Sequence, residues 1–243
     1  MVLHQCFNTN SIDFHEWVFD HLEAKPKHKI LELGCGNAVL WKKNKDRLPE
    51  EISVVLSDLS WGMALAAFQA VEKDKRFRPL VCDIQVFPAR SEELFDQIIA
   101  NHVFHHVPNL ENVVQGIYEK LKPGGFLYTV TNGKDHMKEM YSMIQKAIPG
   151  FVPNLYLQKQ YLLEDAPTIL SKKFKNIEVI PFINDLWITE AKPLIAYIIS
   201  MFGIKPFLTN ENINHLEKYL MERIETEGGI KITKSTGIVI GSK

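Results

Sequence analysis

The sequence predicts an α/β fold, a doubly wound, mostly parallel seven-stranded sheet with helices on both faces and a helical insertion in the C-terminal half. Over the first 132 residues, short apolar runs alternate with helix-like segments, which is typical of βαβ units and a parallel sheet. The second half is less regular, but it adds two further β-like stretches. Together these observations give seven strands.

The elements of the first half follow from their residue patterns. Residues 11–22 place Phe14, Trp17 and Leu22 on one face behind a candidate cap at Ser11, which predicts a helix. "KILEL" (29–33) reads as a strand, and the text from Asn37 to 48 as a helix. The later elements are expected as strand 51–58, helix 61–74, strand 77–83, strand 94–101, helix 110–121 and strand 126–132.

In the second half we expect helices at 134–148 and 162–174, a strand at 176–184, a helical stretch at 186–226 and β structure at 229–243. The longest apolar run, "PLIAYIISMFG" (193–203), is too short to span a bilayer, and lysines flank it. It therefore predicts a buried helix.

Composition excludes several classes of partner. The chain has 28 basic and 29 acidic residues, so no excess of positive charge is available for a broad nucleic-acid interface. Its three cysteines show no metal-like pairing and favour a reducing compartment, which predicts a cytoplasmic protein. The N-terminal text has no apolar leader pattern, and we expect neither membrane nor nucleic acid as a partner.

A glycine-rich turn follows the strand at 29–33. Such a turn lets the backbone approach a ligand and directs the free N–H groups of the next helix at an anion. Gly34-Cys35-Gly36 is followed by Val39 where a dinucleotide fingerprint would place its third glycine. A nicotinamide-dependent dehydrogenase is therefore disfavoured, and no Gly-Lys-Ser/Thr follows to make a phosphate loop.

The segment Glu32-Leu33-Gly34-Cys35-Gly36 resembles motif I of the class I S-adenosylmethionine-dependent methyltransferases, a family with a Rossmann-like fold. The resemblance extends from about residue 28 to 131 through the acidic Asp58, the pair Asp83-Ile84, Asn101 and the turn "LKPGG". Ala38 stands where the family has its third glycine, and Asn37 replaces a smaller residue. Because alanine is also small, we expect cofactor binding to survive.

The resemblance implies S-adenosylmethionine as cofactor. The residues expected to bind it are Glu32, Gly34, Cys35, Gly36, Asn37, Asp58, Leu59, Met63, Asp83, Ile84 and Asn101.

Roles within this set follow from the family and from spacing. Asp58 lies 22 residues after Gly36, close to the roughly 20 expected for a carboxylate that accepts ribose hydroxyls. Asp83 would accept from the adenine amino group, and Glu32 would organise the amino end of the cofactor. Ile84 and either Met63 or Trp61 would cover the adenine faces.

Each role has a purely structural alternative. Asp58 could cap the helix that starts near Gly62, and Asp83 could be a turn carboxylate. Glu32 could simply hydrogen-bond the glycine turn. Met63 and Trp61 could belong to the core or the rim.

The acceptor side is less readable. Methyl transfer needs positioning of the acceptor and, for a protonated acceptor, removal of a proton. A histidine is a suitable base, but no catalytic residue can be assigned and no metal site is expected. The available side chains are His102, His105 and His106, and later Asp135, His136 and Tyr141.

The motif after the fourth strand, Asn101-His102-Val103-Phe104, lacks the Asn/Asp-Pro-Pro-Tyr/Phe with which amino-methylating nucleic-acid enzymes hold a flipped base. A small-molecule methyl acceptor is therefore favoured. Residues 134–226 are expected to form an acceptor-side or lid elaboration, although aromatic helical text also fits a core or a homodimer contact. The aromatic residues of this range that could line a lid or an acceptor pocket are Phe151, Tyr156, Tyr161, Trp187, Tyr197 and Phe202.

We thus expect residues 1–243 to form a single methyltransferase domain with its cofactor-binding core at 28–132. The expected reaction is methylation of an unidentified small molecule at oxygen or nitrogen. The alternative is a non-catalytic module that binds S-adenosylmethionine or S-adenosylhomocysteine.

Overall fold

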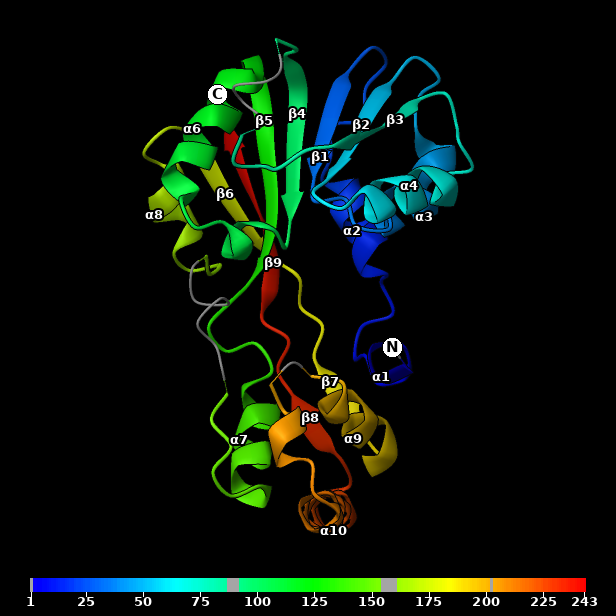
Figure 1. The fold of residues 1–243 in the computed structure, drawn as a ribbon, viewed down its shortest axis with the longest axis vertical. Helices are drawn as coiled ribbons and strands as arrows, with labels where there is room; N and C mark the ends of the chain where they lie inside the picture. The colour runs from blue at the N-terminus through cyan, green and yellow to red at the C-terminus, as the bar shows by residue number, and fades with distance from the viewer. Residues whose placement is uncertain (1, 87–91, 154–160, 202) are drawn as a thin grey trace. The chain divides into compact units, whose positions relative to one another are not determined.

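The computed structural model describes residues 2–86, 92–153, 161–201 and 203–243, and Figure 1 shows its helices and strands. Tyr156 and Phe202, two of the aromatic residues singled out above, lie outside these described ranges. The chain forms two compact units. One, the sheet unit, contains residues 12–132, 158–181 and 237–243. The other, the helical unit, contains residues 1–11, 133–157 and 182–236.

The sheet unit is built on one seven-stranded sheet. Its strands in spatial order are β3 (Phe77–Val81), β2 (Ser53–Asp58), β1 (Lys29–Leu33), β4 (Phe95–Asn101), β5 (Leu121–Asn132), β9 (Thr236–Ser242) and β6 (Lys175–Pro181). The pairs β1–β2, β1–β4, β2–β3 and β4–β5 are parallel, whereas β6 and β9 are antiparallel. The predicted α/β fold with a mostly parallel seven-stranded sheet is confirmed.

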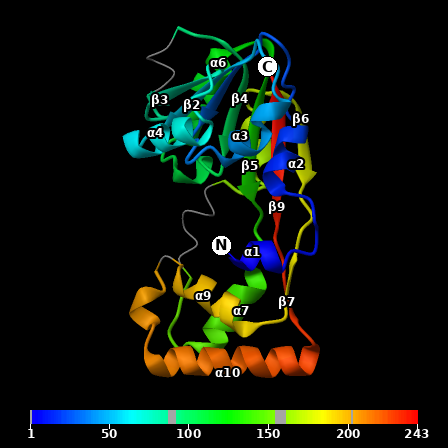
Figure 2. The same cartoon turned by 90° about the vertical axis from the view of Figure 1, so that its right-hand side faces the viewer.

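Alternate residues of the strands build two different cores. Ile30 of β1 packs in one cluster with residues of α2 (Phe14–Asp20), α3 (Val39–Asn44) and α4 (Trp61–Ala70). Leu31, the next residue, packs in another cluster with α6 (Leu110–Lys120) and α8 (Ala166–Leu170). Because successive side chains of a strand point to opposite faces, these helices cover both faces of the sheet, as Figures 1 and 2 show.

The helix boundaries depart from the predicted ones at several points. Asp13, not Ser11, caps α2, because its carboxylate accepts hydrogen bonds from the backbone N–H groups of His15 (2.9 Å) and Glu16 (3.2 Å). The helix predicted from Asn37 begins at Val39, since Ala38 has a left-handed backbone (φ 53°). The helix predicted over 162–174 shrinks to α8.

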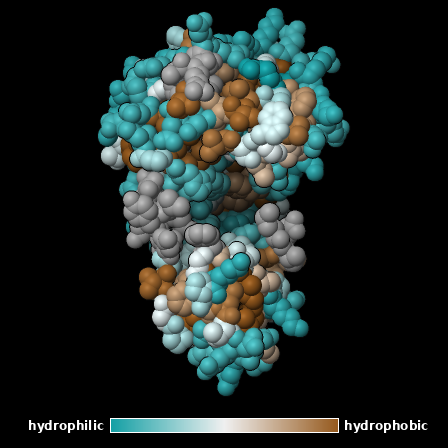
Figure 3. Space-filling model, viewed as in Figure 1, coloured by the Kyte–Doolittle hydropathy of each residue, from teal (hydrophilic) through white to brown (hydrophobic). Residues whose placement is uncertain are grey.

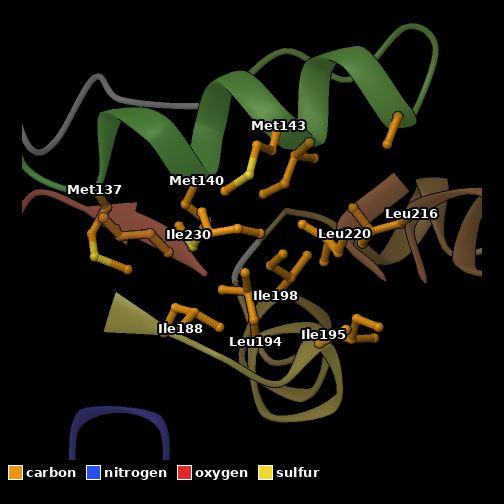
Figure 4. Packing of buried hydrophobic residues seen from close by; sticks show 14 of the residues in the cluster. Met137, Met140, Met143, Ile188, Leu194, Ile195, Ile198, Leu216, Leu220 and Ile230 are labelled. Atoms are coloured by element: carbon orange, nitrogen blue, oxygen red, sulfur yellow. The ribbon is translucent and has the colours of Figure 1, made fainter. Parts of the chain in front are cut away.

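The helical unit has its own hydrophobic core. Its elements are α1 (Val2–Cys6), α7 (Lys138–Ala147), β7 (Leu186–Ile188), α9 (Ala191–Ile199), α10 (Asn210–Glu227) and β8 (Ile230–Ile232). Figure 4 shows methionines of α7 directed toward aliphatic side chains of α9 and α10. Methionine adapts to irregular gaps, which suits a core assembled from short elements.

The start of the predicted helical stretch 186–226 is a strand. β7 pairs antiparallel with β8, placing Leu186 opposite Ile232 and Ile188 opposite Ile230. Leu186 and Ile188 are buried while Trp187 between them is exposed, so the period of two decides the structure. The buried helix predicted from the apolar run is confirmed as α9, and no helix among the described residues is long and apolar enough to cross a membrane.

Leu220 and Met221 give a matched pair for testing the core of the helical unit. Leu220 is fully buried, whereas its neighbour Met221 on α10 is 48% exposed. We expect Leu220→Ala to lower the free energy of unfolding by about 2–5 kcal/mol, because it leaves a cavity. Met221→Ala should change it by no more than about 0.5 kcal/mol. Urea denaturation compares the two, and equal effects would contradict this packing.

Candidate cofactor-binding site

A cleft of about 360 Å³ lies at the carboxyl ends of the parallel strands, where open α/β sheets bind their ligands. Its floor is formed by the strand ends, and its walls by the segments that follow them. The residues predicted from the sequence that line it are Gly34, Asp58, Leu59, Asp83, Ile84 and Asn101. Figure 3 shows hydrophobic surface (brown) exposed among hydrophilic surface (teal) on the sheet unit. Leu59, which lines the cleft, is 71% exposed.

A second cavity of about 160 Å³ contains three more of the predicted residues, Glu32, Cys35 and Asn37. Gly34, Asn101 and His102 line both spaces. Gly36 and Met63 line neither of these two cavities.

The glycine turn explains why this sequence needs glycine twice. Gly34 has φ 69°, and a Cβ on it would lie 2.4 Å from Cγ2 of Val103, so any side chain would clash. Gly36 has φ 52°, and a Cβ there would meet no atom within 4 Å. The first glycine therefore permits close packing with the segment after β4. The second leaves its backbone open to an approaching ligand.

Asp58 ties the turn to the end of β2. Its carboxylate accepts hydrogen bonds from the N–H groups of Gly36 (3.0 Å) and Ser60 (2.9 Å). It does not cap α4, because Ser60 is the cap and accepts from the N–H of Met63 at 3.3 Å. A carboxylate offers about four lone-pair sites, so Asp58 retains acceptor capacity toward the cleft.

Glu32 is a buried carboxyl group with only 4% of its surface exposed. Burial raises its pKa to about 8, the negative charge of Asp58 adds to this, and hydrogen bonds from Trp41 and Asn101 oppose it. The Trp41 indole Nε1–H donates to Glu32 Oε2 at 2.6 Å. On the same side, Asn101 Oδ1 is buried and has no hydrogen-bond partner within the described part of the chain. Such a group marks a place that a donor on a ligand would complete.

Asp83 lies two residues beyond the end of β3. Its carboxylate accepts from the N–H of Gln85 at 2.9 Å, so the turn role foreseen for it is present. The same side chain lines the larger cleft beside Ile84.

The histidines after β4 divide into two groups. His102, whose φ is 53°, lines both cavities, and His106 lines the larger one. His105 lines neither, and burial together with the charge of His106 lowers its pKa to about 4. The described residues hold no group of three or more potential metal ligands. Asp135, His136 and Tyr141 belong to the helical unit.

Sequence reasoning did not assign the contribution of α2. Phe14, His15 and Val18 line the smaller cavity. The spacing of the apolar residues in the sequence predicts this helix and its apolar face, but it does not indicate that the helix lines a cavity. The signal for where the helix starts was Asp13, whose capping bonds place His15 in the first turn.

Comparison with known proteins gives the family context. Residues 31–127 match the family model described as "Methyltransferase domain". The chain is 30% identical over 146 residues to the mitochondrial ubiquinone biosynthesis O-methyltransferase of Rattus norvegicus, covering 55% of this chain and 40% of that protein. It thus spans well under half the length of that relative. It is 23% identical to malonyl-[acyl-carrier protein] O-methyltransferase 1 of Ilyobacter polytropus, covering 86% of this chain and 78% of that protein.

Solved structures agree on the fold. Phosphoethanolamine N-methyltransferase 2 of Haemonchus contortus, solved in complex with S-adenosyl-L-methionine, superposes with a TM-score of 0.56 at 18% identity. The match covers 94% of this chain and 52% of that one. The sequence motifs, the strands β1 to β5 and the match to the family model all lie within residues 28–132. These findings support a class I S-adenosylmethionine-dependent methyltransferase, with S-adenosylmethionine as its cofactor.

Proposed function

We propose that this protein binds S-adenosylmethionine in the cleft at the strand ends and transfers its methyl group to a small molecule at oxygen or nitrogen. The observation that carries the proposal is the open backbone at Gly36, held beside the carboxylate of Asp58. On one side of this turn lies the smaller cavity, lined by the buried carboxyl of Glu32 and by Asn101, whose Oδ1 has no hydrogen-bond partner among the described residues. On the other lies a cleft lined by Asp83.

The residues fit the two ends of such a ligand. Asp58 would accept the ribose hydroxyls with its remaining lone pairs, while Asp83 accepts from the adenine amino group. Leu59 and Ile84 give the cleft apolar walls for the base. Glu32 and Asn101 Oδ1 would accept from the amino group at the methionyl end, and the backbone from Gly34 to Asn37 would meet its carboxylate.

When bound, the cofactor supplies an electrophilic methyl group on a sulfonium, so the protein's task is mostly positioning. The chain's own residues must hold the acceptor atom in line and exclude water. A protonated acceptor must also lose its proton. His106 and His102 are the histidines that line the cleft, and we propose them as candidates for this role.

Three finer assignments are also proposals. Oxygen is favoured as the acceptor atom because two relatives are described as O-methyltransferases. Residues 134–226 are proposed to supply acceptor recognition. The support is that most of this range, apart from residues 158–181, belongs to the helical unit, which has a core of its own. Cys6, Cys35 and Cys82 are free thiols, which supports a reducing, cytoplasmic location.

The direct test is time-dependent formation of S-adenosylhomocysteine by the purified full chain with a panel of small hydroxylated and amino acceptors. We expect turnover with at least one class of acceptor. Tight cofactor binding without turnover on any acceptor would instead support the non-catalytic binding module.

Asp58 provides a test of the cofactor site. We expect Asp58→Ala to weaken S-adenosylmethionine affinity by about tenfold or more, or roughly 1.4 kcal/mol, because it removes the acceptor for the ribose. Isothermal calorimetry measures the effect. Asp165→Ala, an exposed aspartate whose side chain makes no capping bond, is the matched control. Asp58→Asn keeps the shape of the side chain, and circular dichroism checks the fold of each variant. Unchanged affinity in folded Asp58→Ala would remove this residue from the site.

Glu32 makes stability depend on pH. Its pKa is about 8 in the folded protein against 4.5 for an unperturbed glutamate. Between these values the folded chain holds a proton that the unfolded chain has lost, so the free energy of unfolding falls as pH rises through this window. Glu32→Gln cannot ionise, and we expect its stability relative to the natural chain to increase from pH 5 to pH 8 (about the span between the two pKa values).

Urea denaturation across this range measures the difference between the two proteins. Glu222→Gln on α10, at a glutamate with 61% of its side chain exposed, is the control and should run parallel to the natural chain. If Glu32→Gln also ran parallel, the buried carboxyl would be ionised in the folded state.

A further inference from the structure

Glu32 is a carboxyl group in the wall of a cavity, and its hydrogen-bond donors are neutral. Its side chain lines the smaller cavity of the sheet unit together with Asn101. The Trp41 indole N–H donates to its Oε2 at 2.6 Å, and the Asn101 side chain also hydrogen-bonds it. Within the described ranges, no lysine, arginine or histidine forms an ion pair with Glu32. The carboxyl group therefore has hydrogen-bond partners but no counter-charge among these residues.

The titratable groups on the neighbouring strand and turn supply no positive charge. Asp58, at the end of β2, carries a negative charge that acts on Glu32. Burial, followed by the charges of Glu32 and Asp58, raises the pKa of the Cys35 thiol. The thiol therefore stays uncharged at neutral pH.

The groups on α2, on α3 and after β4 complete the surroundings of the cavity. His15 on α2 and His102 after β4 both line it. The Lys43 ammonium of α3 pairs with the Asp13 carboxylate, which also lies 3.8 Å from the Nδ1 of His15. Burial is the largest cause that lowers the pKa of His15, so this ring favours its neutral form. The lysine on this side is thus already engaged by an aspartate.

A buried carboxyl group without a counter-charge retains its proton, because the charged form loses more on leaving water. Burial accordingly raises the pKa of Glu32 to about 8. In the same cavity, Asn101 Oδ1 is buried with no hydrogen-bond partner among the described residues. An ammonium group has three N–H donors and no acceptor. One such group would give Glu32 its counter-charge and Asn101 its donor.

We propose that Glu32 gives up its proton when the ammonium group of S-adenosylmethionine docks beside it, so that cofactor binding at neutral pH releases one proton. The proposal rests on the proposed function, because it takes Glu32 and Asn101 as partners of the methionyl amino group. The O–H bond of the carboxyl group breaks, its proton passes to the buffer, and the carboxylate accepts an N–H of the ammonium instead. The ion pair forms only in the complex.

Proton release makes cofactor affinity depend on pH. Below the pKa of Glu32, binding must first remove the proton, and this cost decreases as the pH rises. The amino group of the ligand stays mainly protonated below about pH 7.7. We therefore expect the affinity to rise about tenfold per pH unit from about pH 6 to about pH 7.5.

The test is isothermal calorimetry of the full chain with S-adenosylhomocysteine, which carries the same amino group. Titrations at about pH 6.5 in two buffers of different ionisation enthalpy give the number of protons exchanged, and we expect about one released per ligand bound. Glu32→Gln cannot ionise, so it should release none, and its affinity should not change with pH. Glu222→Gln, at a glutamate with 61% of its side chain exposed, is the control and should behave as the natural chain.

A matched ligand makes the test independent of any variant. An analogue of S-adenosylhomocysteine that lacks only the amino group cannot form the ion pair. We expect the natural chain to bind this analogue without releasing a proton and with an affinity that does not vary over the same pH range.

The outcomes separate this proposal from the function on which it rests. S-adenosylhomocysteine that binds without proton release, or with the same release in Glu32→Gln, overturns the proton exchange and leaves the cofactor site standing. Equal proton release with the analogue that lacks the amino group also overturns it. A folded chain that binds neither S-adenosylhomocysteine nor S-adenosylmethionine would overturn both.

Discussion

The hydrogen bond that Asp58 accepts from the backbone of Gly36 fixes the geometry on which the site depends. It joins the segment after β1 to the end of β2, and a second bond, from Cys35 N–H to the Ser57 carbonyl at 2.8 Å, runs beside it. Both glycines of the turn have positive φ angles. A turn fixed before a ligand arrives does not lose conformational freedom on binding, and this saving contributes to affinity.

The same strand explains the unusual state of Glu32. Its neighbours Leu31 and Leu33 face the core that contains α6, so alternation directs Glu32 toward the opposite face, where Trp41 of α3 packs. A carboxyl group on this face is removed from water. The indole N–H and the Asn101 side chain compensate part of the cost, and the remainder appears as a raised pKa. A cationic ligand group would complete the compensation.

Strong periodicity made the sheet unit predictable from its sequence. β1 and the end of β4 at Asn101 lie where the apolar runs and the polar residues after them indicated. The residues Asp58, Asp83 and Asn101 meet because parallel strands share their carboxyl ends. The positions of the sequence motifs therefore predicted which residues line the cleft.

The sequence predicted the structure less well where contacts between residues far apart in the chain determine the local conformation. The strand at 186–188 exists because β8, more than forty residues later, pairs with it, and local composition around it favours a helix. Gly36 carries its role through the backbone, so the motif identified it although its position lines neither cavity.

The order of segments has a consequence for biosynthesis. β9 lies between β5 and β6 in the seven-stranded sheet, and β8 completes the two-stranded sheet with β7, so residues 230–242 complete both units. The helical unit's core likewise joins Leu3 to Ile230. A nascent chain can pair β1 to β5 early, but contacts of such long sequence separation form late. The core of the helical unit stays incomplete until Ile232 leaves the ribosome, and that of the sheet unit until residues 238–240 do. Hydrophobic surface of both units therefore stays exposed until synthesis is nearly finished.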